Sequence, residues 1–365
     1  MNPIHVTKPS MPPFEEYVEE IRGLWETKWL SNRGDKHKQL ETKLAERLDA
    51  KNISLFANGH VALEVAINAF GFPKGGEVIT TAYTHCSTTH SIVRNNIVPV
   101  FCDINENDLS INTEEIKRHI TEKTVAIVAT HVYGLICNVT EIEKIASQYN
   151  LKVIYDAAHA FGVTVNGKGV ANWGNASMFS CHATKVFNTI EGGITVFNDD
   201  RVFGKIESLI NFGFNGPEDV QFVSTNARMN EFEAAMGLCN LRHFDEEVAK
   251  RKRVADRYDE RLSGITGIRL LQPQPGVSQN HSYYIAFFDG YKKNRDKIQE
   301  ELKLGNIFAR KYFYPMITEL HCYQNQYAHV RVPVAKRAAD TVISLPMYAD
   351  LTVDEVDEIC DIILK

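Results

Sequence analysis

The sequence predicts an α/β protein: a mainly parallel sheet covered by helices on both faces, followed by a smaller α+β unit. Three observations support this class. Between residues 53 and 156, short apolar runs alternate with amphipathic helical patterns, as in sheets built from strand–helix repeats. After Asn230 the pattern is helical to about Leu262. A chain of 365 residues is also long for one domain and favours two.

The predicted elements follow in order along the chain. Residues 15–30 are expected to form a helix and residues 30–34 a turn. Strands are predicted at 53–56, 77–80, 98–102, 124–130 and 151–155, with helices at 60–70, 87–94 and 139–149 between them. Residues 264–275 carry several Gly and Pro residues and are expected to be a connection. Strands at 283–288 and 308–312 and helices at 293–304 and 352–364 would form the smaller unit.

The composition argues against several classes of function. A formal charge of −6 leaves no basic excess to neutralise phosphates, so we expect no nucleic-acid partner. The seven cysteines are odd in number and include no Cys-x-x-Cys, which favours reduced thiols in a cytoplasmic protein without a zinc or other metal site. No segment looks long and apolar enough to span a membrane, and residues 1–9 do not resemble a signal peptide.

One segment gathers reactive groups around a single lysine. From Ser180 the chain runs Ser-Cys-His-Ala-Thr-Lys-Val-Phe-Asn-Thr-Ile-Glu-Gly-Gly, which places Lys185 in a mostly apolar setting. Loss of solvation favours the neutral amine of a lysine, the form that attacks a carbonyl. An ordinary surface lysine is the alternative interpretation.

A carboxylate follows a second apolar run. Asp156 comes directly after Val153-Ile-Tyr155, which is expected to carry it to the core side of the sheet. A buried carboxylate needs a cationic partner, and the protonated pyridine of pyridoxal 5'-phosphate (PLP) would supply one. A lysine nucleophile and a buried carboxylate are the two protein groups that PLP requires. A strand-end carboxylate that caps a helix is the alternative.

Further polar residues lie where predicted strands end, the edge at which parallel sheets collect ligands. Gly59 and His60 occupy a strand-to-helix turn whose N–H groups suit a phosphate, and Ser180 would add a hydroxyl unless it bonds the backbone. His159 is expected either to hydrogen-bond the carboxylate or the cofactor, or simply to pack. His85 would stack on the pyridine ring or, alternatively, cap a helix or be exposed.

Together these residues resemble the DegT/DnrJ/EryC1/StrS family of PLP-dependent nucleotide-sugar aminotransferases, a branch of the aspartate aminotransferase-like (type I) fold. The resemblance spans nearly the whole chain. It is carried by Trp29-Leu-Ser-Asn-Arg-Gly34, Asn58-Gly59, Asp156-Ala-Ala-His159, Ser180 to Gly193, Asn226-Ala-Arg-Met229, Glu233-Ala-Ala-Met-Gly237, Tyr312-Phe-Tyr-Pro315 and Leu345-Pro-Met-Tyr348. It implies an N-terminal arm and helix at 1–34, a PLP-binding large domain with a seven-stranded sheet at 35–250, and a small α+β domain at 251–365.

Family roles carry over one residue at a time. Lys185 resembles the Schiff-base lysine, and Asp156 resembles the partner of the pyridine nitrogen. Ser180 and the amides of Gly59 and His60 resemble the ligands of the cofactor phosphate.

The remaining positions carry weaker expectations. His85 stands where the family usually has a larger stacked ring, and His60 where it usually has threonine or serine, so the side-chain phosphate contact of His60 is left open. Asn226 resembles the asparagine that reaches the phosphate of the neighbouring subunit, which implies a homodimer with shared sites. The candidate substrate contacts are His182, Asn188, Arg228, Tyr312 and Tyr314.

The resemblance implies a reaction in two halves. L-Glutamate gives its amine to PLP, leaving pyridoxamine phosphate, and the keto carbon of a nucleotide-linked hexose then takes the amine. Residues 6–13 and 311–316 are most similar to enzymes that aminate C4 of dTDP-4-keto-6-deoxyglucose. The product, dTDP-4-amino-4,6-dideoxyglucose, would serve the O-antigen of lipopolysaccharide or another surface glycan. Amination at C3 of a 3-keto sugar, PLP-dependent sugar dehydration and a regulatory role are the alternatives; a lysine rather than a histidine at position 185 favours amino transfer.

Overall fold

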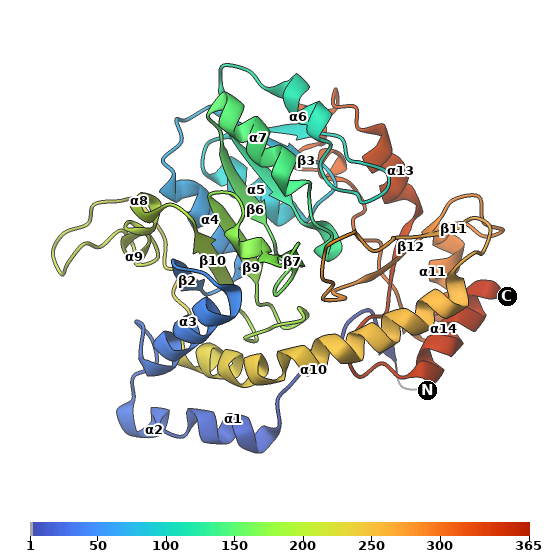
Figure 1. The fold of residues 1–365 in the computed structure, drawn as a ribbon, viewed down its shortest axis with the longest axis horizontal. Coiled ribbons are helices and arrows are strands. Elements are labelled where there is room, and N and C mark those ends of the chain that lie inside the picture. Colours follow the sequence, from blue (N-terminus) through green and yellow to red (C-terminus); the bar gives the residue numbers. More distant parts are fainter. Residues whose placement is uncertain (1–2) are drawn as a thin grey trace.

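A seven-stranded sheet forms the centre of the computed structural model, which describes residues 3–365 (Figure 1). Its strands in spatial order are β2 (Ile53–Phe56), β10 (Gly193–Phe197), β9 (Ala176–Ser180), β6 (Lys152–Asp156), β5 (Thr124–Thr130), β3 (Glu77–Thr81) and β4 (Val98–Cys102). β10 is antiparallel to both its neighbours, whereas the other paired strands are parallel. The predicted mainly parallel, seven-stranded sheet is confirmed.

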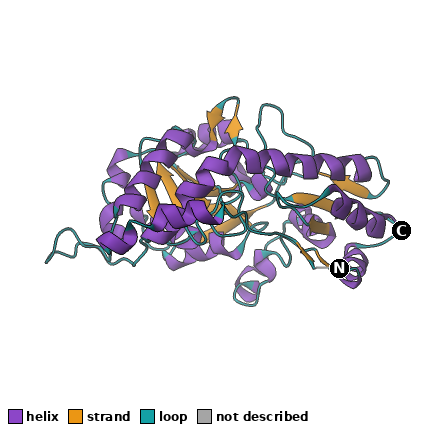
Figure 2. Cartoon of the chain, turned by 90° about the horizontal axis from the view of Figure 1, so that it is seen from below, coloured by secondary structure: helices purple, strands orange, loops and turns teal. Residues whose placement is uncertain are grey.

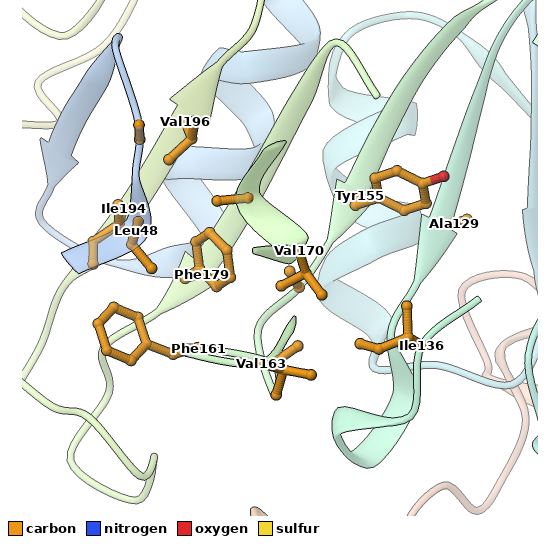
Figure 3. Packing of buried hydrophobic residues seen from close by; sticks show 14 of the residues in the cluster. Leu48, Ala129, Ile136, Tyr155, Phe161, Val163, Val170, Phe179, Ile194 and Val196 are labelled. Atoms are coloured by element: carbon orange, nitrogen blue, oxygen red, sulfur yellow. The ribbon is translucent and has the colours of Figure 1, made fainter. Parts of the chain in front are cut away.

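Helices cover both faces of this sheet (Figure 2). Successive side chains of a strand point to opposite faces. In β6, Val153 and Tyr155 accordingly join one core cluster and Ile154 another. The first cluster packs against α3 (Asp35–Leu48), α7 (Val139–Tyr149) and α10 (Glu231–Leu262), and the second against α4 (Gly59–Ala69), α5 (Cys86–Arg94), α8 (Asp200–Phe203) and α9 (Ile206–Leu209). Figure 3 shows Tyr155, Phe179 and Ile194 in the first cluster.

The C-terminal part contains a second, antiparallel sheet of β11 (Ile268–Leu270), β12 (Tyr284–Phe288) and β14 (Val342–Leu345). Its helices are α11 (Arg295–Leu304), α13 (Pro333–Thr341) and α14 (Val353–Leu364). The N-terminal strand β1 (Ile4–His5) pairs with β13 (Ile307–Phe308) beside this unit. The long helix α10 runs from the large sheet to α14 (Figure 1). The expected boundary at residue 250 lies inside this helix, and the division into domains stays a prediction.

The predicted elements agree with the structure except in three places. The helix expected at 15–30 is broken into α1 (Phe14–Ile21) and α2 (Leu24–Thr27), because Gly23 has a low helix propensity. The connection at 264–275 contains β11, which follows turns at Gly264 and Gly267 that have positive φ. The strand expected at 308–312 ends at Phe308; Arg310 then makes a single bridge to Ser344 of β14, and Tyr312 and Phe313 line a cavity.

The remaining elements are short. They are α6 (Thr113–His119), α12 (Gln324–Tyr327), β7 (Thr164–Val165), β8 (Lys168–Gly169) and the 3₁₀ turns η1 (Val132–Gly134), η2 (Val170–Asn172) and η3 (Ile317–Glu319). None of the helices within residues 3–365 has both the length and the apolar character needed to cross a membrane.

Candidate active site

A cavity of about 520 Å³ opens where β2, β3, β5, β6 and β9 end. Many of the predicted site residues line it: Gly59, His60, His85, Asp156, His159, Ser180, His182, Lys185 and Tyr312. The parallel topology explains this convergence, because it carries the carboxyl ends of neighbouring strands to one edge.

Asp156 is the last residue of β6, and only 3% of its surface is exposed. Its carboxylate accepts hydrogen bonds from the hydroxyl of Thr88 at 2.6 Å and from the backbone N–H of Ala158 at 3.1 Å. It forms no ion pair with any residue between 3 and 365. A buried carboxylate with only neutral donors is incompletely compensated, so a cationic ring nitrogen fits this position.

Lys185 lies in the connection between β9 and β10, with its side chain at the cavity wall. The connection is closed by a hydrogen bond from the N–H of Cys181 to the carbonyl of Gly192, 2.9 Å long. Nζ of Lys185 lies 3.5 Å from the hydroxyl of Tyr283 and has no carboxylate partner in the described part of the chain. An amine without a counter-ion that faces a cavity is suited to attack a carbonyl.

His159 is buried beside this lysine. Its Nδ1 accepts a hydrogen bond from the backbone N–H of Tyr133 at 3.0 Å. Burial and the nearby charge of Lys185 hold the pKa of His159 well below its usual value. The ring is therefore neutral near pH 7, with its proton on Nε2, the nitrogen that lies nearer Tyr283.

The start of α4 offers a cradle for an anion. Asn58 caps the helix by accepting a hydrogen bond from Val61 N–H at 2.9 Å. The first N–H groups of a helix have no partner within it, which leaves those of Gly59 and His60 for a ligand. A Cβ on Gly59 would lie 2.9 Å from Cβ of Ser180, so only glycine permits this approach. These groups fit a phosphate.

Side chains on α4 and α5 extend this end of the cavity. The Nδ1 atom of His60 lies 2.9 Å from the hydroxyl of Ser87, and its Nε2 lies 3.6 Å from Glu64. The His60 ring thus connects the two helices. His85 caps α5 by accepting from the N–H of Ser87 at 3.2 Å, as its alternative interpretation expected, and it also lines the cavity.

The candidate substrate contacts divide into two groups. His182 and Tyr312 line the cavity, and Tyr312 also lines an adjoining one of about 600 Å³ together with Tyr314. Asn188 lies outside both, where its buried amide donates to the carbonyl of Ser10 at 3.0 Å.

Asn226 and Arg228 also lie outside both cavities of this chain. They contact each other, with Arg228 Nε 2.9 Å from Oδ1 of Asn226. The ring of Phe212 lies 5.6 Å from the Arg228 guanidinium. The substrate and partner-subunit roles of these residues stay predictions.

Sequence reasoning missed several members of the site, and three of them are informative. Thr88 donates to Asp156, Tyr283 contacts Lys185, and Phe313 lines the cavity. The position of Thr88 three residues after His85 was a usable signal, because the two lie on the same turn at the start of α5. Tyr283 immediately precedes β12 of the small sheet, and no local pattern placed it near residue 185.

Comparison with known proteins identifies the family. A model of the DegT/DnrJ/EryC1/StrS aminotransferase family matches residues 14–364. The chain belongs to this aminotransferase family. The match confirms the predicted family, and with it the predicted class of enzyme.

Individual members of the family agree with this assignment. The chain is 41% identical to a dTDP-4-amino-4,6-dideoxy-D-glucose transaminase from Shigella dysenteriae, over 98% of this chain and 97% of the relative. It is 38% identical to an Escherichia coli enzyme of the same name, over 99% and 98%. Among solved structures, that of DesI in the presence of its TDP-sugar product matches with a TM-score of 0.94 and 31% identity, covering 100% of this chain and 92% of DesI.

Proposed function

We propose that this enzyme uses PLP to transfer an amino group from L-glutamate to C4 of dTDP-4-keto-6-deoxyglucose, giving dTDP-4-amino-4,6-dideoxyglucose. The observation that carries the proposal is that Lys185 and Asp156 line the same cavity of an aminotransferase-family chain. The substrate follows from the two relatives of 41% and 38% identity, both named for this sugar.

Different residues of the cavity would bind different parts of the cofactor. Asp156 would keep the ring nitrogen protonated, while Ser180 and the N–H groups of Gly59 and His60 would bind the phosphate. When bound, PLP supplies the electron sink for amino transfer. The free amine of Lys185 acts as the base that moves a proton from the substrate α-carbon, since it faces the cavity without a counter-ion.

The adjoining cavity suits the nucleotide part of the substrate. It is lined by two cationic side chains, Arg310 and Lys311, and by the aromatic rings of Tyr312 and Tyr314. Cations bind a diphosphate, and aromatic rings pack against a base. The two cavities share Tyr312 and Phe313, so one substrate would extend through both.

A homodimer with shared sites completes the proposal. Asn226 lies outside the cavity of its own chain, as expected of a residue that serves the neighbouring subunit. The adjacent segment exposes Phe212, Phe214, Val220 and Val223, the last at 99%. Exposed apolar groups of this kind are typical of a surface that another chain covers. We place the enzyme in the cytoplasm, on a route to a surface glycan such as the O-antigen.

The decisive experiment is NMR of the product made from dTDP-4-keto-6-deoxyglucose, L-glutamate and the purified protein. An amine on C4 is the expected result, and ring couplings would give its stereochemistry. Failure to aminate this sugar, with turnover of a 3-keto sugar instead, would transfer the proposal to C3. Consumption of sugar without gain of nitrogen would indicate a dehydratase.

A further inference from the structure

Tyr283 lies between the two nitrogen-bearing side chains of the cavity. Its hydroxyl oxygen is 3.5 Å from Nζ of Lys185 and 3.4 Å from Nε2 of His159. Its ring meets that of His159 edge-on, with centroids 4.7 Å apart. The lysine Nζ lies 5.9 Å from the centre of the Tyr283 ring. The hydroxyl therefore bridges residues 98 and 124 positions away in the chain.

The segment before Tyr283 is fixed to the same histidine. The buried side chains of Asn280 and Ser282 both donate to the carbonyl of His159, at 2.9 and 2.8 Å. These bonds attach the start of β12 to the loop that follows β6. The hydrogen bonds of Asn280 and Ser282 thus help to hold the Tyr283 hydroxyl in place, in addition to its own contacts.

The direction of the hydrogen bonds follows from the tautomer of His159. Its Nδ1 is already an acceptor for the Tyr133 N–H, so Nε2 carries the proton and donates toward the Tyr283 oxygen. The Lys185 ammonium donates to the same oxygen at 3.5 Å, and once the amine is neutral it can instead accept the Tyr283 hydroxyl proton, which the His159 contact leaves free. A hydroxyl at this position can therefore keep a hydrogen bond to the amine in the form that attacks a carbonyl.

We propose that Tyr283 is a positioning residue that holds the neutral amine of Lys185 toward the cavity. This inference rests on the proposed role of Lys185 and assigns Tyr283 the task of orienting it. Titratable neighbours of the lysine include His159, His85 and Cys181, and Asp156, His182 and Glu191 line the same cavity. Burial lowers the pKa of His159 and raises that of the Cys181 thiol, so neither is charged near neutral pH.

The test compares two neighbouring tyrosines. Tyr283→Phe removes the proposed contact, whereas Tyr284→Phe removes a hydroxyl that donates to Asp259 at 2.7 Å, outside the cavity. Each full-length variant is stripped of cofactor and mixed with PLP, and covalent capture is followed by absorbance across a range of pH. The rate of the half-reaction with L-glutamate is measured on the reloaded enzymes.

For Tyr283→Phe we expect capture at neutral pH to slow about 3- to 10-fold and the pH midpoint of capture to rise by about 0.4 to 1 unit, the effect of one hydrogen bond. Tyr284→Phe should match the wild type in both. A slower Tyr283→Phe with an unmoved midpoint would indicate a structural role and overturn the proposal, as would a midpoint and rate equal to those of the wild type.

Lys185→Ala separates this inference from the function on which it rests. It should show no covalent capture. If Lys185→Ala captures PLP as fast as the wild type, the assignment of the lysine fails, and the role of Tyr283 fails with it. If only Tyr283→Phe behaves like the wild type, the proposed function stands and the positioning role alone is refuted.

Discussion

At the residue scale, the carboxylate of Asp156 has hydrogen-bond donors but no positively charged partner among the described residues. Thr88 and the Ala158 N–H supply hydrogen bonds without supplying a positive charge. An asparagine could still accept the Thr88 hydrogen bond through its side-chain oxygen, so the charge can be removed while much of the local structure is kept.

We therefore expect Asp156→Asn to slow both half-reactions by at least about 30-fold, or about 2 kcal/mol of activation free energy, because a neutral partner does not hold a proton on the ring nitrogen. Single-turnover absorbance measurements with L-glutamate and with the keto sugar would check this. Asp245→Asn is the matched control, since that carboxylate pairs with Arg47 on the surface. Unchanged half-reactions in Asp156→Asn would remove the residue from its role.

His131 carries a prediction about pH. It is fully buried after β5, its Nδ1 accepts from Cys137 N–H at 3.2 Å, and its ring stacks on Tyr155. Burial lowers its pKa to about 3. In the unfolded chain the same ring takes a proton as the pH falls through about 6.5. The unfolded state thus binds more protons below that pH, and stability falls as the pH decreases.

Lowering the pH from 7 to 5 should reduce the free energy of unfolding by about 2 kcal/mol through this histidine. Urea unfolding of the wild type and of His131→Asn, whose side-chain oxygen can replace Nδ1 as an acceptor, would measure it at both pH values. Other buried histidines contribute equally to both proteins. We expect the loss to be about 2 kcal/mol smaller in the variant; equal losses would contradict the assignment.

At the scale of elements, the site depends on helices that begin where strands end. β2 leads through Asn58 into α4, and β3 leads through His85 into α5. The sharp turn before α4 brings its backbone against β9, at Gly59 and Ser180. The N-terminal N–H groups of α4 consequently face the same cavity as Lys185.

Gly59→Ala tests this arrangement. The new methyl group would lie 2.9 Å from Cβ of Ser180 and would separate the two phosphate ligands. We expect the dissociation constant for PLP to rise about 10-fold or more, or about 1.4 kcal/mol, as measured by equilibrium titration of stripped protein. Gly23→Ala is the control, because a Cβ at that position meets nothing within 4 Å. Equal PLP affinity in both variants would show that the α4 start does not bind the phosphate.

At the scale of the whole molecule, Asn226 and Arg228 do not line the cavity of their own chain. Both follow the exposed apolar segment that contains Phe212 and Phe214. A partner chain that covers this segment would bring the two polar side chains toward a second cavity. In the proposed dimer, each chain would therefore complete the active site of the other.

Mixing two inactive variants would test shared sites. Lys185→Ala lacks the nucleophile, and Asn226→Asp should repel the cofactor phosphate. In a heterodimer one site would combine an intact Lys185 with an intact Asn226 from the other chain. Random pairing of equal amounts should restore about a quarter of the wild-type activity, because one site in four is then native. Differently tagged chains would verify that heterodimers form; heterodimers without recovered activity would refute the shared site.

The sequence by itself determined the parallel sheet and the convergence of Asp156, Lys185 and Gly59 at one edge. These follow from local apolar patterns and from the rule that parallel strands present their carboxyl ends together. The tertiary structure decided the rest. It placed Tyr283 beside Lys185, turned the amide of Asn188 toward Ser10, and ended the strand expected at 308–312 after Phe308. The contacts of Tyr283 and Asn188 join residues 98 and 178 positions apart, so they depend on how distant parts of the chain pack, which no local pattern encodes.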